Sequence, residues 1–416
     1  MMNFARTLNL FSREPYRLFF PLGILIGMFG VSHWLLFALG WTQSYSGAFH
    51  SSIQMQGYMS CFIIGFLLTA MPRFASAPSA SKWELFSFLF LTLGIAVFLQ
   101  MSWFVAADVL FVCWLLAILR FAAVRFLNRR DKKVMPPTEF VWIPIGIFHG
   151  ILGSALLVIG KLFSCPDWVV HVGKPMMLQG FLFSVVIGVG GFLGPRLMGV
   201  QQLINPDNIK KEAACAPAAM EIIRKQRIVM HLMAGMILFL TFWLEGIGFK
   251  AVAYALRAIV VTGEFLFTGV LPGPPRVKSV FALMLWISFI MVTFGSWGEF
   301  FFPKYRVAML HFVFLGGFSL MTFAVGTVVV LSHAGEGGKL YRPLPVLWLV
   351  LVCVLGALVF RVSADLFPAQ YFNLLGKAAA IWLMGALIWF LFILPKVFRF
   401  PEDGTFEREH EKAKIR

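Results

Sequence analysis

Charged side chains are scarce in this sequence. Asp, Glu, Lys and Arg make up 13% of its 416 residues, whereas 60% are hydrophobic, and the mean hydropathy is +0.84. Soluble domains contain about 25% charged residues and about 45–50% apolar ones. The composition therefore excludes an ordinary soluble domain and predicts a polytopic membrane protein.

Cysteine motifs and the common catalytic signatures are also absent. The five cysteines are scattered and form neither CxxC nor CxxCH, which excludes covalently attached c-type haem and a disulfide framework. There is no Walker loop, no dinucleotide fingerprint and no nucleophile elbow, so enzymes of those classes are not expected. No two histidines are adjacent, and a respiratory haem–copper oxidase needs such a pair for its copper. That class is kept only as a remote alternative.

Apolar segments of membrane-spanning length recur along the whole chain. A helix needs about 20 apolar residues to cross the hydrocarbon layer, and we predict twelve spans, at about 17–41, 52–71, 83–100, 103–124, 140–160, 174–195, 227–245, 249–270, 280–297, 306–331, 344–362 and 372–395. The first run is too long for a signal peptide. The predicted fold is all-α, with a single transmembrane bundle over residues 17–395, an amino-terminal segment 1–16 and a charged tail 396–416.

Lysine and arginine are unevenly distributed among the loops. They cluster after the fourth span, in residues 125–133, and after the sixth, in residues 210–227, whereas the loop between the first two spans contains none. Basic loops face the cytoplasm, so we expect both termini to be cytoplasmic. The net charge of +16 has the same origin, and the expected partner is the lipid bilayer rather than nucleic acid.

A repeat relates the second span to the sixth. Residues 55–73 align without a gap with residues 178–196, and Gln56 corresponds to Gln179 at an offset of 123 residues. The tenth span, from His311, follows the same plan loosely. The repeat predicts that spans two, six and ten carry metal-capable polar side chains at equivalent depths.

The predicted topology sorts the histidines by depth. Four fall near the outer ends of spans: His33, His50, His171 and His311. Two fall near the inner ends: His231 and His333. His311 and His333 lie about 33 Å apart along one helix, so a metal centre must join different helices at one depth. Neutral imidazole binds copper and iron. A single interfacial histidine is more often explained by a hydrogen bond, and it is the group of four at one depth that makes a metal site an equal alternative.

A few charged residues fall inside the predicted spans. Arg257 and Glu264 lie seven residues apart on one face of the eighth span, where they form a structural pair or Arg257 binds a haem propionate. Asp108 is a candidate for a proton or ion relay. If such charges line a substrate path, the protein is a secondary transporter, because carriers also contain about twelve helices with internal repeats. The two matched segments run in the same direction, which favours the transporter less than an inverted repeat would.

Several sequence blocks carry a further signal. GFLLTA at residues 65–70 lies after His50 and before Pro72, GGFLGPRLMG occupies residues 190–199, and LHFVFLGG…TVVVLSHAG occupies residues 310–335. With the early PYRLFFPLG, these blocks resemble the NnrS family of bacterial membrane proteins. The sequence departs from the family pattern at Ser52 and Ile53, where the family has a second histidine and a glutamate, and at Phe192 and Val328, where it has arginines.

The resemblance implies a haem- and copper-containing protein of the bacterial inner membrane that is linked to nitric oxide stress, with nitric oxide as its small-molecule ligand. Topology and resemblance together select candidate ligands for haem b: His50, His311, His333, His231 and Arg257. The candidates for a metal ion such as copper are His50, His171, His311, His33 and His333. Neither the redox partner nor enzymatic turnover follows from the sequence.

Overall fold

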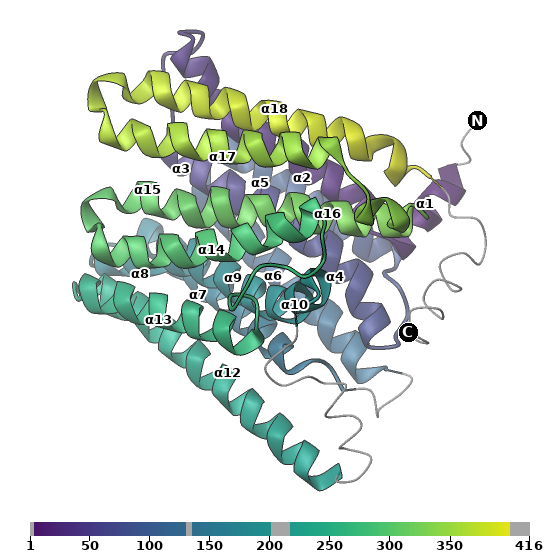
Figure 1. Ribbon diagram of the computed structural model, residues 1–416. Helices are drawn as coiled ribbons and strands as arrows, with labels where there is room; N and C mark the ends of the chain where they lie inside the picture. Colours follow the sequence, from purple (N-terminus) through teal and green to yellow (C-terminus); the bar gives the residue numbers. More distant parts are fainter. Residues whose placement is uncertain (1–3, 130–134, 201–216, 400–416) are drawn as a thin grey trace.

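The computed structural model describes residues 4–129, 135–200 and 217–399. These residues form helices joined by short turns, and the described ranges contain no strand (Figure 1). The predicted all-α class is therefore confirmed. The predicted carboxyl-terminal tail lies almost wholly outside the described residues.

Within these described ranges, twelve helical segments are long and apolar enough to cross a membrane. Nine consist of one main helix: α2 (Tyr16–Ala38), α5 (Lys82–Gln100), α6 (Phe104–Leu127), α7 (Trp142–Leu162), α12 (Pro217–Gly246), α13 (Lys250–Thr268), α14 (Val280–Phe301), α17 (Pro345–Leu366) and α18 (Tyr371–Val397). Each of the twelve coincides with a predicted span. A short helix, α1 (Phe4–Arg13), precedes them and packs against α5.

The second, sixth and tenth spans are composite helices in which α-helical segments alternate with π-helical turns. The second contains α3 (Gly47–Ser52), η1 (Ile53–Met59) and α4 (Ser60–Phe74). The sixth contains α8 (Trp168–Pro175), η3 (Met176–Gly180), α9 (Phe181–Val185), η4 (Val186–Gly190) and α10 (Gly191–Met198). The tenth contains α15 (Arg306–His311), η6 (Phe312–Ser319) and α16 (Leu320–His333). The π turns η1 and η3 begin 123 residues apart, which is the offset of the sequence repeat.

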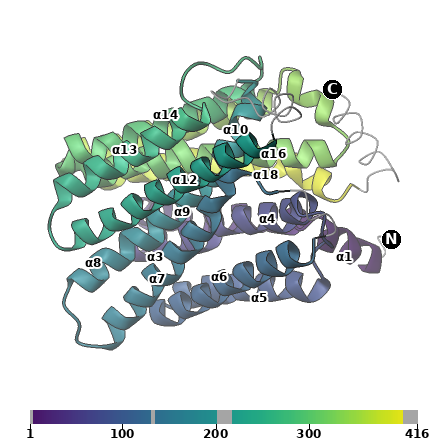
Figure 2. The ribbon, with the colours of Figure 1, turned by 90° about the horizontal axis from the view of Figure 1, so that it is seen from below.

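These three spans are also the most deeply buried part of the bundle. Burial over their apolar windows is 78%, 72% and 67%, against 28–56% for the other nine spans. The repeat therefore marks the inner layer of the protein. The remaining helices surround it, with α5 and α6 along one edge (Figure 2).

Close helix packing explains the glycine of the repeated Gln-Gly pair. A Cβ atom at Gly57 would lie 2.6 Å from Ile26 Cγ2, and one at Gly180 would lie 2.9 Å from a ring carbon of Phe242. Real side chains do not approach so closely. Glycine at these positions lets a neighbouring helix touch the backbone of the inner spans.

Both ends of the described chain lie at one end of the bundle (Figure 1). The rings of Phe11, in α1, and Phe398, just after α18, are 6.1 Å apart. A chain that crosses the membrane an even number of times has its two ends on the same side. We call this the terminal end and the other side of the membrane layer the opposite end.

Candidate metal site and buried polar clusters

Three of the predicted ligands gather at the opposite end. His33 is in α2, His50 in α3 and His311 in α15. The ring centres of His33 and His50 are 5.8 Å apart. His311 lies within electrostatic range of His50, and the Arg361 guanidinium lies within range of both. Segments far apart in the sequence therefore bring these imidazoles to one depth.

Hydrogen bonds fix the tautomer of all three rings. His33 Nδ1 and His50 Nδ1 lie 2.9 and 3.1 Å from the same acceptor, the Gly30 carbonyl oxygen, and His311 Nδ1 lies 2.7 Å from the Val307 carbonyl oxygen. A carbonyl only accepts, so each Nδ1 must donate, and in a neutral imidazole Nε2 then keeps its lone pair. Metal-binding histidines have this arrangement. The His33 Nε2 atom is buried and has no hydrogen-bond partner of normal geometry within the described ranges, although the Ser46 carbonyl also faces this ring.

The fourth outer histidine does not join this group. His171 is exposed on α8, which packs against α7 and α12. Within the described ranges, no three side chains of His, Cys, Asp or Glu form a group able to hold a metal ion. The candidate site consists of the His33–His50 pair with His311 nearby, and further ligands would have to be of another kind.

The two inner histidines belong to separate clusters. His231 on α12 is fully buried, and its Nδ1 lies 2.8 Å from Glu264 Oε2 on α13. Its Nε2 has no hydrogen-bond partner in the part of the chain that the structure describes. His333 ends α16 and lies between two charged residues, with Nδ1 3.1 Å from Glu14 Oε1 and Nε2 2.8 Å from Arg73 Nη1. No contact in the described structure joins His231 to His333, so the geometry does not support the predicted pair.

The residues around His333 tie the two ends of the chain together. Arg17 Nε donates to Glu14 Oε2 over 2.6 Å. The Arg17 guanidinium also donates to four backbone carbonyls, at 2.8–3.3 Å, those of Lys396, Val397, Arg399 and His333. We call Glu14, Arg17, Arg73 and His333 the terminal cluster.

Stability should depend on acid pH through Glu14. Burial alone would raise the pKa of this carboxyl group, but His333 and Arg17 lower it, from an ordinary value of 4.5 to about 2. A depressed pKa means that the carboxylate stabilises the fold above pH 4.5 and loses this effect as the pH falls from 4.5 towards 2. At pH 6 the free energy of unfolding of the wild-type protein should be about 2 kcal/mol higher than that of Glu14→Gln. This figure is lower than the full pKa shift implies, because the cluster is partly exposed and solvent screens its charges. Thermal unfolding at pH 6 and pH 3 checks this, and a difference that does not shrink at pH 3 contradicts it.

Arg257 belongs to a buried cluster of two arginines and two glutamates. Arg257 Nη2 lies 2.6 Å from Glu245 Oε2, and its Nη1 donates to Gln179 Oε1 over 2.8 Å. Arg306 lies 2.9 Å from both Glu245 Oε1 and Glu299 Oε2. The guanidinium of Arg257 is thus engaged by protein partners, which does not favour its predicted alternative role at a haem propionate. The predicted Arg257–Glu264 pair is not formed either, because Glu264 faces His231.

The repeat-related glutamine has an equivalent role in the second span. Gln56 Nε2 donates to Asp108 Oδ1 over 2.8 Å, and Asp108 Oδ2 lies 3.0 Å from Lys161 Nζ. Gln56 is fully buried, whereas the Lys161 side chain is 36% exposed. The glutamines at positions 56 and 179 therefore each bind a buried ionic group. The sequence repeat showed that the two glutamines are equivalent, but residue type alone did not reveal which charged side chains they bind.

A further histidine was not among the predicted ligands. His149 on α7 is fully buried, and its Nδ1 lies 3.2 Å from Ser184 Oγ. The Ser184 hydroxyl donates to the Gly180 carbonyl, so the imidazole must donate to the hydroxyl. The His149 Nε2 atom has no hydrogen-bond partner among the residues described. The position of His149 near the middle of a predicted span was the sequence feature that could have marked it as a buried histidine.

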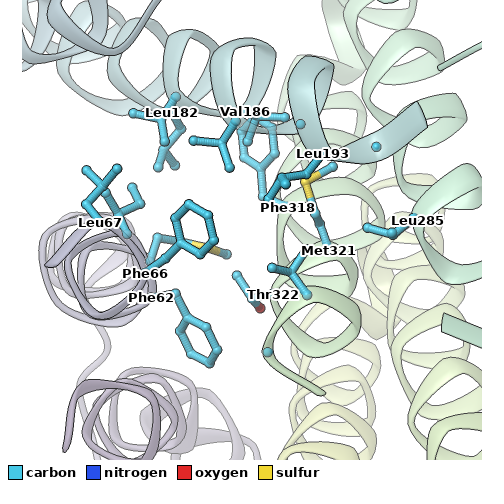
Figure 3. A pocket seen from close by; sticks show the side chains of 18 of the residues that line it. Phe62, Phe66, Leu67, Leu182, Val186, Leu193, Leu285, Phe318, Met321 and Thr322 are labelled. Carbon is cyan, nitrogen blue, oxygen red and sulfur yellow. The ribbon is translucent and has the colours of Figure 1, made fainter. Parts of the chain in front are cut away.

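An apolar pocket of about 100 Å³ lies among the three inner spans (Figure 3). Its wall includes Met59 and Phe62 from the second span, Leu182 from the sixth, and Phe318 and Met321 from the tenth. No lining residue is ionisable. Empty apolar cavities stay dry and accept small apolar molecules, so this pocket suits a diatomic gas and offers nothing to a haem propionate.

The fold and these sites define the class of the protein: a polytopic helical membrane protein with three repeat-related inner spans and imidazoles available at one end. The chain belongs to the NnrS family, because the family described as "NnrS protein" matches residues 10–400. Among curated proteins, none matches the chain. Membership suggests a membrane protein that is related to nitric oxide and associated with haem or copper.

Proposed function

We propose that this protein holds a haem or copper centre through His33, His50 and His311 and acts in the nitric oxide response of a bacterial inner membrane. The observation that carries the proposal is the Gly30 carbonyl, which binds the Nδ1 atoms of both His33 and His50. One acceptor thereby orients two imidazoles from different helices, and in the neutral ring of His50 it leaves Nε2 unprotonated. Family membership supplies the link to nitric oxide.

The two imidazoles are close together, but their present orientation does not converge on one ion. Their ring centres are 5.8 Å apart, and because both Nδ1 atoms face the Gly30 carbonyl, their Nε2 atoms point away from each other. Since a metal–nitrogen bond is about 2 Å long, a single ion would bind both rings only after one ring rotates. A bound metal would supply the coordination position for nitric oxide. The protein's part is to fix the rings, keep them neutral and keep bulk water away from their buried edges.

The residues fit haem less well than they fit a single metal ion. His333 is bound into the terminal cluster through both ring nitrogens, so a bis-histidine haem on His231 and His333 does not fit. His231 alone would hold a haem iron there, with Glu264 orienting its ring as carboxylates do for metal-binding histidines.

The apolar pocket favours a small uncharged ligand over a polar substrate. Nitric oxide partitions into membranes, and the pocket lies among apolar side chains of the inner spans. The basic loops favour the predicted orientation, with both termini in the cytoplasm.

Metal analysis of the purified protein tests the proposal directly. Full-length protein is purified in detergent from cells supplied with copper and a haem precursor, and copper, iron and the absorption spectrum are measured with and without nitric oxide. We expect stoichiometric copper or a haem Soret band that nitric oxide shifts. Colourless, metal-free protein would contradict the proposal and favour the transporter, whose charged path would then include Asp108.

A histidine exchange locates the centre. His50→Ala should lower the bound metal per protein by about tenfold or more, because it removes a ligand and leaves one imidazole of the pair. His171→Ala is the matched control, since that ring is exposed and outside the group. Equal metal content in the two variants would place the centre elsewhere.

A further inference from the structure

A second, polar pocket lies on the outside of the bundle at the terminal end, between the first turn of α5 and the last turns of α6. Its volume is about 530 Å³. The span that contains α5 is the least buried of the twelve, at 28%, and both helices run along the edge of the bundle (Figure 2). This pocket therefore opens towards the lipid–water boundary.

One wall of the pocket is rigid. Arg125 is 6% exposed, and its guanidinium donates to Glu84 Oε2 over 2.7 Å and to the Ser79 carbonyl over 3.1 Å. Glu84 and Ser81 also form the capping box that starts α5. The Arg125 Nε–H is buried and has no hydrogen-bond partner among the described residues. Charged donors are therefore fixed before any ligand arrives.

The pocket lining also contains a cation outside this ion pair. Arg120 lies in the pocket wall, is exposed and forms no ion pair or hydrogen bond in the described structure. Arg120 and Arg125 together outweigh Glu84 by one positive charge. The pocket thus suits a monoanion, and arginine binds phosphate oxygens well because of its planar set of donors.

The surroundings of the pocket are those of a membrane interface. Trp83, in its wall, is 83% exposed, and exposed tryptophan is typical of the headgroup level. Large apolar side chains are exposed further along the two helices, at Phe90 on α5 and at Leu116 and Leu119 on α6. A polar pocket above an apolar helix face fits an amphiphile.

We propose that this pocket binds the phosphate diester of an anionic phospholipid, with the acyl chains along the exposed face of α5 and α6. Arg120 pairs with the phosphate, and the serine hydroxyls of the wall bind the remaining headgroup oxygens. Basic pockets between membrane helices bind anionic headgroups elsewhere. The site is separate from the histidine group at the opposite end.

Native mass spectrometry of the full-length protein in detergent tests this proposal. The protein is titrated with phosphatidylglycerol, phosphatidylcholine and glycerol 3-phosphate. We expect phosphatidylglycerol to bind about fivefold or more tightly than phosphatidylcholine, from the contribution of one cation near a membrane surface. Equal affinity for the two lipids would overturn the proposal. Glycerol 3-phosphate binding as tightly as the lipid would identify a site for a soluble phosphate instead.

Matched variants separate this pocket from general surface charge. Arg120→Leu should abolish most of the preference for phosphatidylglycerol, with unchanged unfolding temperature and metal content, because Arg120 has no ion pair or hydrogen bond with the described residues. Arg342→Leu, on the exposed loop between α16 and α17, makes the same charge change away from the pocket. If both variants reduce phosphatidylglycerol binding equally, the pocket has no specific role.

Discussion

Replacing Arg257 with leucine is expected to lower the free energy of unfolding by about 3 kcal/mol. The cluster of Arg257, Arg306, Glu245 and Glu299 is electrically balanced, and Glu245 and Glu299 are 9% and 1% exposed. Removing one arginine leaves a net negative charge in a poorly solvated site, and breaking a buried pair in this way costs about 3–5 kcal/mol. The lower figure applies because Arg306 still contacts both glutamates. Reversible unfolding in detergent measures the change.

Two further variants show whether charge imbalance is the cause. The double variant Arg257→Leu with Glu245→Leu restores the balance and should be more stable than Arg257→Leu alone. Lys225→Leu removes one partner of an exposed ion pair with Glu221 and should leave the unfolding temperature unchanged, because exposed pairs contribute little. A double variant less stable than the single one would mean that packing, not charge, dominates at this site.

Replacing Arg17 with leucine should release the carboxyl end of α18 and cost about 3 kcal/mol. The Arg17 side chain is fully buried, binds Glu14 and donates to backbone carbonyls of Lys396, Val397 and Arg399. Hydrogen bonds from a charged donor contribute about 1.5–3 kcal/mol each, and the carbonyls at the end of α18 would lose their partner. Amide hydrogen exchange in the last turns of α18, from residue 390 to residue 397, should become faster. Mass spectrometry measures this exchange directly.

The control for this variant is a neighbouring arginine. Arg13, on α1, is exposed and has no ion pair in the described structure, so Arg13→Leu should leave exchange unchanged. Arg17→Lys should recover only part of the protection, because an ammonium group cannot reach several carbonyls in the plane of a guanidinium. Unchanged exchange in Arg17→Leu would show that apolar packing alone holds the end of α18.

The membrane spans were predictable because each one is a continuous apolar segment, which can be read directly from the sequence. The span predicted at 83–100 is α5, Lys82–Gln100, and the remaining eleven also coincide with helices. The repeat predicted which helices are equivalent, and the structure places those three innermost. The short helix α1 fell within the segment predicted as residues 1–16 and was not anticipated, because its ten residues are too few for a span.

Partners within the bundle were harder to predict, because they depend on the rotation of each helix about its axis. Arg257 and Glu264 share a face of α13, and α12 faces it with Glu245 opposite Arg257 and His231 opposite Glu264. The hydropathy of the two segments does not determine which residue of α12 lies opposite which residue of α13. The predicted depth in the membrane placed His33, His50 and His311 in one layer, and the structure has them at one end of the bundle. The same depth was predicted for His171, but the rotation of α8 about its axis leaves that side chain exposed.

The π turns at Ile53 and Met176 bear on how the two glutamines are oriented. A π turn holds an extra residue within an otherwise α-helical segment, and the two begin 123 residues apart, each three residues before its glutamine. The wider turn changes the direction in which the following side chains leave the helix. Gln56 and Gln179 therefore leave the inner spans at equivalent positions, and each meets a buried charge.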